Sequence, residues 1–166
     1  MWSFGLIFMN KNQLEKVVVN AGIGRLSQSA GFTDKILPEL ETEFASFTGQ
    51  KPVLKTAKKS IAGFKIREGN VVGIMTTLRG ARMMSFINKL VHIALPRVRD
   101  FRGIPLKNVD KNGNLTIGIK EHIVFPEVSA EVSKLNFGLQ ATIVPKVRGR
   151  EKALEIYKLI GIPFSK

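Results

Sequence analysis

Cationic side chains are interspersed with small residues and one aromatic ring between positions 55 and 69. Small residues let backbone amides and lysines approach phosphates closely, and the ring of Phe64 can stack on a base. A run of charge is also typical of a solvated surface loop. The clustering and the interleaved ring favour a segment that binds RNA, with these residues as its candidate contacts: Lys55, Lys58, Lys59, Ser60, Phe64, Lys65 and Arg67.

A second basic motif contains Arg97, Arg99 and Arg102 around a single acid, Asp100. Arginine binds phosphate or carboxylate through two parallel hydrogen bonds, so the motif fits a phosphate or an acidic partner. It equally fits an internal Arg–Asp network that holds a loop. The sequence does not separate these two interpretations.

A glycine pair, Gly22 and Gly24, follows a β-branched run and resembles the start of a dinucleotide-binding fingerprint. Ser27 occupies the third position of that fingerprint, and no acidic residue closes a following parallel strand. A turn is the better interpretation, and a nucleotide-dependent enzyme is a minor alternative.

Side chains that commonly carry catalysis are sparse. His92 and His122 stand apart from any serine, carboxylate pair or metal-ligand spacing, and we expect His92 to be semi-buried packing. Three acids lie on a helix whose other face is apolar, which indicates a solvated face: Glu39, Glu41 and Glu43. We therefore predict that the protein is no enzyme and has no metal or cofactor.

The positive charge is concentrated in the middle of the chain. The 166 residues carry 26 Lys and Arg against 13 Asp and Glu, a net charge of +13 and a pI of about 10.3. Residues 51–102 hold twelve of these cations and two of the acids, whereas residues 1–50 hold four and five. Such an excess calls for a polyanionic partner, a nucleic acid or an anionic membrane surface.

The first nine residues, MWSFGLIFM, are apolar. They are too short to span a bilayer, which needs about 20 apolar residues. They also lack the basic start and cleavage site of a secretory signal. We interpret residues 1–14 as a peripheral extension of a single domain over residues 15–166. A membrane-surface protein that uses this apolar stretch as an anchor is the alternative to an RNA-binding protein.

Hydrophobic periodicity predicts the secondary structure. Residues 15–21 read as a strand, and Thr33 caps a helix that begins near Pro38 and ends at Gly49. Residues 51–69 suggest short strand pieces around a long basic loop. In residues 71–79, alternation directs Val72, Ile74, Thr76 and Leu78 to the core, and Val71, Met75, Thr77 and Arg79 to the other face.

The second half of the chain follows the same order of elements. A helix after Gly80 carries an apolar stripe and is ended by Pro96: Met83, Phe86, Ile87, Leu90 and Ala94. An irregular loop at 97–113, strands at 115–120 and 138–147, and a last helix around Tyr157 complete the chain. The order predicts an α+β domain, an antiparallel or mixed sheet with helices on one face. The other, open face is a plausible RNA platform.

Several motifs in consecutive order resemble one family. They are Thr48–Pro52, Ala57–Gly69, Leu78–Gly80, Ala94–Gly103 and Gly118–Glu127. In order and spacing they are similar to the large-subunit ribosomal protein five family, the protein that binds 5S rRNA in the central protuberance. The resemblance covers roughly residues 15–164.

The resemblance implies a concave sheet face that grips 5S rRNA and residues that recognise it: Asn20, Gln50, Phe64 and Thr77. It further implies cations that neutralise phosphates: Lys51, Lys58, Lys59 and Arg79. Residues 57–69 resemble a loop that approaches P-site tRNA, and residues 103–118 resemble a loop that reaches a small-subunit head protein. The implied partners are 5S rRNA, large-subunit rRNA, P-site tRNA and that head protein, with no membrane. The implied location is the ribosome in the cytoplasm, and we favour a bacterial source because no Arg- and Ser-rich presequence precedes the domain.

The chain departs from the family pattern in three places. Residues 1–12 replace an amphipathic N-terminal helix. Residues 109–114 read VDKNGN where relatives have FDGRGN, which puts the strength of the bridge contact in doubt. Residues 145–150, PKVRGR, replace a small, acidic turn and add positive charge.

Overall fold

A computed structural model describes residues 13–128, 133 and 135–165. Its five strands form one sheet in the order β2-β3-β1-β5-β4, and all four pairings are antiparallel. The strands are β1 (Leu14–Gly22), β2 (Val53–Thr56), β3 (Val71–Leu78), β4 (Leu115–Ile119) and β5 (Leu139–Pro145). The helices are α2 (Leu37–Thr48), α3 (Gly80–Lys89), α4 (Leu95–Arg97) and α5 (Arg150–Ile160). The predicted α+β class and order of elements are confirmed.

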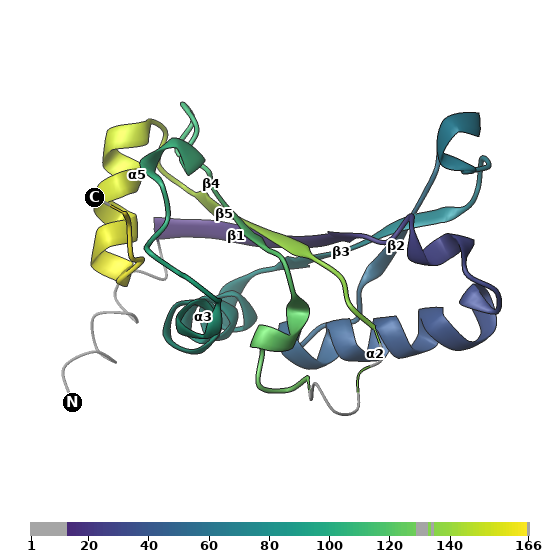
Figure 1. Ribbon diagram of the computed structural model, residues 1–166. Coiled ribbons are helices and arrows are strands. Elements are labelled where there is room, and N and C mark those ends of the chain that lie inside the picture. Colours follow the sequence, from purple (N-terminus) through teal and green to yellow (C-terminus); the bar gives the residue numbers. More distant parts are fainter. Residues whose placement is uncertain (1–12, 129–132, 134, 166) are drawn as a thin grey trace.

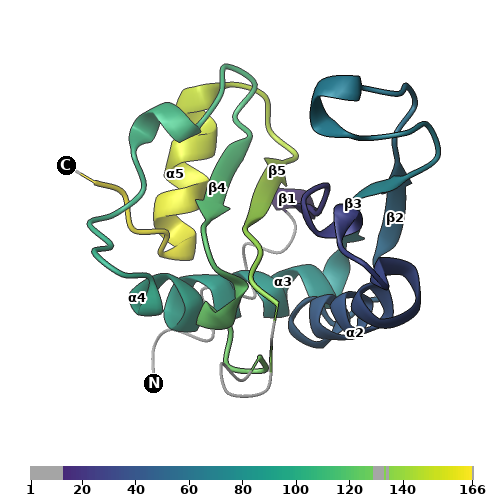
Figure 2. The ribbon, with the colours of Figure 1, turned by 45° about the vertical axis from the view of Figure 1, so that its right-hand side comes forward.

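Helices α2 and α3 lie side by side beneath one face of the sheet, and α5 stands at the end where β5 finishes (Figures 1 and 2). The opposite face is open between α5 and the loop that joins β2 to β3. That loop rises above the sheet at its far end (Figure 1). The sheet thus forms the floor of a concave surface with a raised wall at each side.

Alternation along the strands decides which side chains meet the helices. In β1, Val17, Val19 and Ala21 are buried and Asn20 is exposed. In β3, Ile74, Thr76 and Leu78 are buried, as predicted, whereas Val72, predicted with them, is half-buried; Thr77 is on the open side. A register irregularity between Leu14 and Lys16 returns Leu14 to the core. Leu14 therefore belongs to the first strand, not to the extension predicted for residues 1–14; the rest of that extension up to Asn12 lies outside the described residues.

The helix predictions hold for the apolar stripes and fail at some ends. All five predicted core residues of α3 and its continuation are buried, as is Tyr157 of α5. Thr33 does not cap α2, because it lies within a π-helical turn, Phe32–Ile36, that precedes the helix without a side-chain cap. Pro96 does not end the helical path, which passes through a π-helical turn, Leu90–Ala94, and continues in α4 to Arg97. Gly49 closes α2 with φ of 74°, as expected of a helix C-terminus.

Tyr157 fastens α5 to the sheet and to the turn before β4. Its hydroxyl lies 2.6 Å from the carbonyl oxygen of Gly113 and 3.0 Å from that of Ile143, so one proton serves two acceptors. Burial raises the pKa of Tyr157. The turn itself is closed by Asp110, whose carboxylate accepts from the backbone and side-chain nitrogens of Asn114 at 2.8 and 2.9 Å.

His122 joins α2 to the segment between β4 and β5. The ring is fully buried, stacks on Phe137 at a centroid distance of 3.9 Å, and places Nε2 2.9 Å from Oε2 of Glu43. Glu43 was predicted to lie on a solvated helix face, which is wrong, because its carboxylate turns toward this imidazole and is only 16% exposed. His92, predicted to be semi-buried, is exposed.

Gly113 tests the packing of α5. A Cβ at this position would lie 2.7 Å from Cβ of Ala153 and 3.1 Å from the carbonyl oxygen of Gly149, and φ is +94°. Gly113→Ala is therefore expected to lower the free energy of unfolding by about 2–4 kcal/mol, from overpacking plus backbone strain. Urea denaturation measures this. Gly118→Ala, where the new Cβ meets nothing within 4 Å, is the control and should show no such loss.

His122 predicts a pH dependence of stability. Burial lowers its pKa, and this outweighs the opposing effect of the Glu43 carboxylate. The unfolded chain binds the proton more readily, so stability is full above the ordinary histidine pKa of about 6.5 and falls as the pH drops below it. The urea midpoint of the wild type should decrease between pH 7.5 and pH 5.5. This decrease should be much smaller in His122→Gln and unchanged in His92→Gln. An unchanged decrease in His122→Gln would contradict the assignment.

Candidate nucleic-acid interface

The open face of the sheet carries uncharged polar groups at its centre. The strand register places Met75, Asn20, Gln140 and Gly118 in one row across β3, β1, β5 and β4. The next row contains Thr77, Val18, Thr142 and Thr116, and the hydroxyls of the last two are 3.5 Å apart. Amides and hydroxyls can bond base edges and sugar 2′-hydroxyls, which are the groups that carry identity in RNA.

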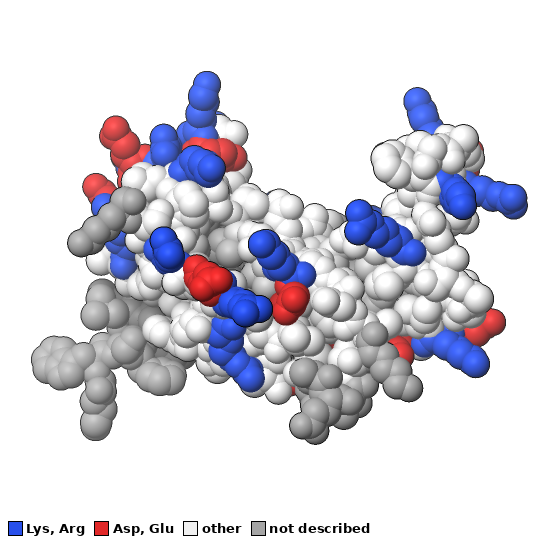
Figure 3. Space-filling view, in the orientation of Figure 1, with Lys and Arg blue, Asp and Glu red and all other residues white. Residues whose placement is uncertain are grey.

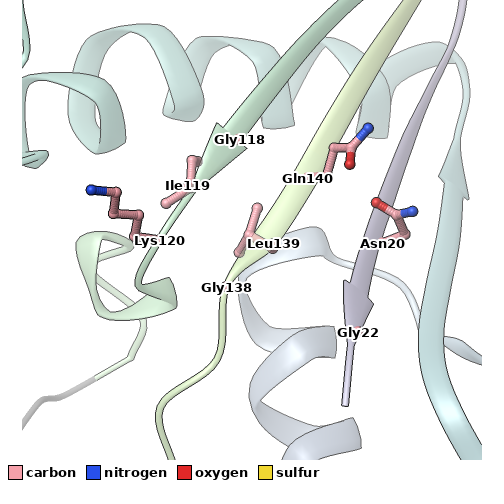
Figure 4. A pocket seen from close by; sticks show the side chains of 8 residues that line it. All are labelled: Asn20, Gly22, Gly118, Ile119, Lys120, Gly138, Leu139 and Gln140. Carbon is pink, nitrogen blue, oxygen red and sulfur yellow. The ribbon is translucent and has the colours of Figure 1, made fainter. Parts of the chain in front are cut away.

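A hollow of about 500 Å³ opens at one end of this face. The amides of Asn20 and Gln140 stand next to each other on paired strands, and Lys120 reaches outward at the far rim (Figure 4). Three glycines line the hollow, and a Cβ on Gly22 or Gly118 would meet nothing within 4 Å. The absence of side chains at these positions leaves room for a ligand above the sheet.

Gln50 and Thr77 are brought together at the start of β2. Nε2 of Gln50 donates to the backbone carbonyl of Thr77 at 3.4 Å, and Nη1 of Arg82 donates to Oε1 of Gln50 at 3.2 Å. Asn20, on the neighbouring strand, lies opposite Met75 rather than Thr77. Two of the four residues implied to recognise RNA, Asn20 and Thr77, thus share the open face, and Gln50 contacts the Thr77 backbone together with Arg82, which was not predicted.

Phe64 is held away from that group, on the raised loop. We call residues 57–70 the basic loop. Its two arms are joined by an antiparallel bridge between Ile61 and Ile66, and a 3-10 turn, Ala62–Phe64, forms the tip. The Phe64 side chain is 65% exposed, and Ser60 accepts a hydrogen bond from the backbone of Glu68 at 2.9 Å.

Cations gather on the walls of the concave face, and two of them, Lys16 and Arg79, lie at one end of its floor. The predicted lysines and arginine of the basic loop are all exposed: Lys58, Lys59, Lys65 and Arg67. Lys55 is exposed on the edge strand β2. Lys and Arg stand on the raised loop and around the opposite end of the molecule, whereas the concave surface between them is mostly free of charge (Figure 3).

Two predicted phosphate-binding cations already have carboxylate partners. Arg79 lies 3.6 Å from Glu15 and Lys51 lies 3.7 Å from Glu41, with the cationic side chains 59% and 82% exposed. Ion pairs this exposed contribute about 0–1 kcal/mol. Such partners can be exchanged for phosphate at small cost.

The three arginines of the motif at 97–103 differ in their contacts. Arg97 donates to the carbonyl of Val124 at 3.3 Å, which ties the end of α4 to the segment after β4. Within the described residues, Asp100 has no ion pair within 4 Å, so the alternative of an Arg–Asp network is not supported. Arg99 and Arg102 are exposed.

Besides Arg82, the sequence interpretation missed three residues of the candidate interface: Gln140, Thr142 and Lys120. The strand at 138–147 was predicted, and its alternation places Gln140 and Thr142 on one face. What the pattern could not reveal is that β5 pairs with β1, because that pairing joins residues about 120 positions apart.

The glycine pair after β1 forms a turn, as predicted. Ser27 donates to the carbonyl of Gly24 at 2.8 Å, and a short 3-10 turn follows, Leu26–Gln28. Among the described residues, no cluster of three or more His, Asp or Glu side chains could hold a metal ion. None of the described helices is long and apolar enough to cross a membrane.

Comparison with known proteins gives one answer along most of the chain. Residues 8–67 match the family model for ribosomal protein L5, and residues 71–164 match the model for the C-terminus of the same ribosomal protein family. The strands of both segments belong to the same sheet.

Individual relatives agree with the family models. The large ribosomal subunit protein uL5 of Halothermothrix orenii is 48% identical over 92% of this chain and 83% of its own length. That of Synechococcus sp. is 45% identical over 96% and 88%, and that of Carboxydothermus hydrogenoformans 42% identical over 100% and 91%. The resemblance, the place in the ribosome and the absence of enzymatic activity are thereby confirmed. The chain belongs to the ribosomal protein L5 family and is a structural constituent of the large ribosomal subunit.

Proposed function

We propose that this protein binds 5S rRNA on the open face of the sheet and helps attach it to the large subunit in the central protuberance. The observation that carries the proposal is the layout of the concave surface. Uncharged amides and hydroxyls occupy the centre of its floor, and cations occupy its walls and one end of the floor. Phosphate contacts position an RNA and contacts to bases and sugars identify it, so this layout suits a specific RNA rather than any polyanion.

The two walls have separate roles in this proposal. The basic loop, with Phe64 at its tip, extends beyond the floor and contacts P-site tRNA as well as rRNA. The region 103–118, held by Asp110 and by the Tyr157–Gly113 hydrogen bond, contacts a protein of the small-subunit head. Support for the second role is the rigidity of the turn, which would present Lys111 and Asn112, both exposed, in a fixed place. The departure at residues 109–114 lies in this turn, so its contact with the head protein differs in side chains from that of relatives.

The membrane-surface alternative depends on the apolar segment MWSFGLIFM, which lies outside the described residues. A general RNA-binding protein is the other alternative. It differs from the proposal in one measurable respect, because it would bind 5S rRNA and an unrelated RNA of equal length equally well at moderate salt.

Single substitutions on the floor and on the wall test recognition. Phe64→Ala should weaken 5S rRNA binding about 5- to 100-fold, since stacking of a base on an aromatic ring contributes about 1–3 kcal/mol. Thr77→Val, which keeps the shape and removes the hydroxyl, should weaken it about two- to tenfold. Filter binding or fluorescence anisotropy at fixed salt measures both.

Matched controls are available on the outer surface. Leu159 is 55% exposed on α5, and Thr33 is exposed before α2. Leu159→Ala and Thr33→Val should bind 5S rRNA as the wild type does. The proposal is overturned if Phe64→Ala and Thr77→Val also bind as the wild type does, or if the wild type shows no preference for 5S rRNA.

Salt dependence tests the role of the cations. Each phosphate neutralised contributes about 0.7–0.9 to the slope of log Kd against log salt concentration. The double variant Lys58→Ala/Lys59→Ala should therefore reduce this slope by about 1.5. Lys35→Ala, which removes one exposed cation from the turn before α2, outside both walls, should leave the slope nearly unchanged. An equal reduction per charge removed in both variants would mean that binding follows net charge alone.

A further inference from the structure

The turn that follows β1 lies next to the basic loop (Figure 1). A Cβ placed on Gly24 would be 3.7 Å from Cδ1 of Ile66, so the two segments are in van der Waals contact there. Beside this contact lies a hollow of about 650 Å³, whose lining includes Gln28, Phe64 and Phe137. The basic loop therefore contacts the turn at Ile66, next to the tip, and a hollow remains between the two segments.

One hydrogen bond spans this space. Nε2 of Gln28 donates to the backbone carbonyl oxygen of Phe64 at 2.6 Å, across 36 positions of sequence. The acceptor is the last residue of the tip turn, and Lys65 after it has φ of +52°. The bond is thus made to the point where the loop reverses direction.

The tip has little else to fix its orientation. Every residue from 58 to 70 is exposed except Ile66, which is half-buried. The other hydrogen bonds described for the loop join its two arms to each other, among them Ala57–Asn70, Ile61–Ile66 and Ser60–Glu68. Among the described residues, the bond from Gln28 is the one hydrogen bond that joins residues 57–70 to the rest of the protein.

We propose that Gln28 is a positioning residue for RNA recognition, which holds Phe64 and Lys65 in the orientation that meets the RNA. The proposal rests on the RNA-binding function proposed above and extends it to a residue outside the interface. A loop with exposed apolar and cationic side chains samples many orientations, of which only some can bind RNA. The affinity of the protein falls in proportion to the fraction of time that the loop spends in the other orientations. Restricting those orientations before binding improves affinity without any new contact to the RNA.

Gln28→Glu is the sharpest variant, because a carboxylate has the same length and no proton to donate at neutral pH. It also adds a negative charge, which would repel RNA by itself. Ser29→Asp is the matched control, since it adds the same charge one residue away at an exposed position for which no contact with the basic loop is described. The comparison of these two variants isolates the hydrogen bond from the charge.

Two measurements follow from the geometry. In the free protein, amide hydrogen exchange at residues 58–68 should be faster in Gln28→Glu than in Ser29→Asp. With 5S rRNA, Gln28→Glu should bind about two- to tenfold more weakly than Ser29→Asp, as expected for loss of one hydrogen bond. The slope of log Kd against log salt should be the same for both, because neither removes a phosphate contact.

A double-mutant cycle distinguishes positioning from direct contact. Gln28→Ala should weaken 5S rRNA binding when it is introduced into the wild type. In the Phe64→Ala background it should change log Kd by less than half as much, because the ring that Gln28 positions is absent. Equal effects in both backgrounds would mean that Gln28 acts independently of Phe64, and the proposal fails. Unchanged hydrogen exchange in Gln28→Glu overturns it equally.

The same data separate this proposal from the one on which it rests. A wild-type protein that binds 5S rRNA no better than an unrelated RNA overturns the RNA function and the positioning role with it. Normal selectivity together with equal affinities of Gln28→Glu and Ser29→Asp overturns the positioning role alone.

Discussion

The register of β1 is the constraint on which the interface depends. β1 is the central strand and pairs with β3 on one side and β5 on the other. Its buried residues, Val17, Val19 and Ala21, fix which side meets the helices. A shift by one residue would bury Asn20 and expose this apolar set, so the hydrophobic core selects the polar face as firmly as it selects the fold. That register also brings distant parts of the chain onto one surface, because Asn20 opposes both Met75 and Gln140.

Local pattern was sufficient for much of the fold and for part of the site. Alternation in β3 correctly placed Thr77 on the open face, because a strand repeats every two residues whatever its partners are. The apolar stripes of α2, α3 and α5 were equally visible. Thr33 failed as a cap because the first turn of helix begins one residue before it, a choice between helix types that composition does not determine.

Contacts between distant segments could not be predicted in this way. The sequence pattern predicts Glu43 to be one more acid on a solvated helix face, and only the folded chain brings His122 to it from 79 positions away. The same is true of Gln50 and Thr77, and of the pairing of β5 with β1. The family resemblance implies that Gln50 recognises RNA, but only the structure shows that its side chain is held by a hydrogen bond to the Thr77 backbone.

The two halves of the interface differ in what holds them in place. The floor is fixed by the sheet and by the helices packed beneath it, so its side chains are presented by the most stable part of the molecule. The basic loop has few buried apolar groups, and such segments open at a low free-energy cost. A surface with a rigid floor and an adaptable loop can recognise an RNA on the floor and adjust to it at the loop. This works only if the loop does not move too freely. The bridge between Ile61 and Ile66 stiffens the loop internally, and the contacts with Gly24 and Gln28 fix it to the body. The turn after β1 thus connects the strand that sets the register of the floor to the loop that forms the wall.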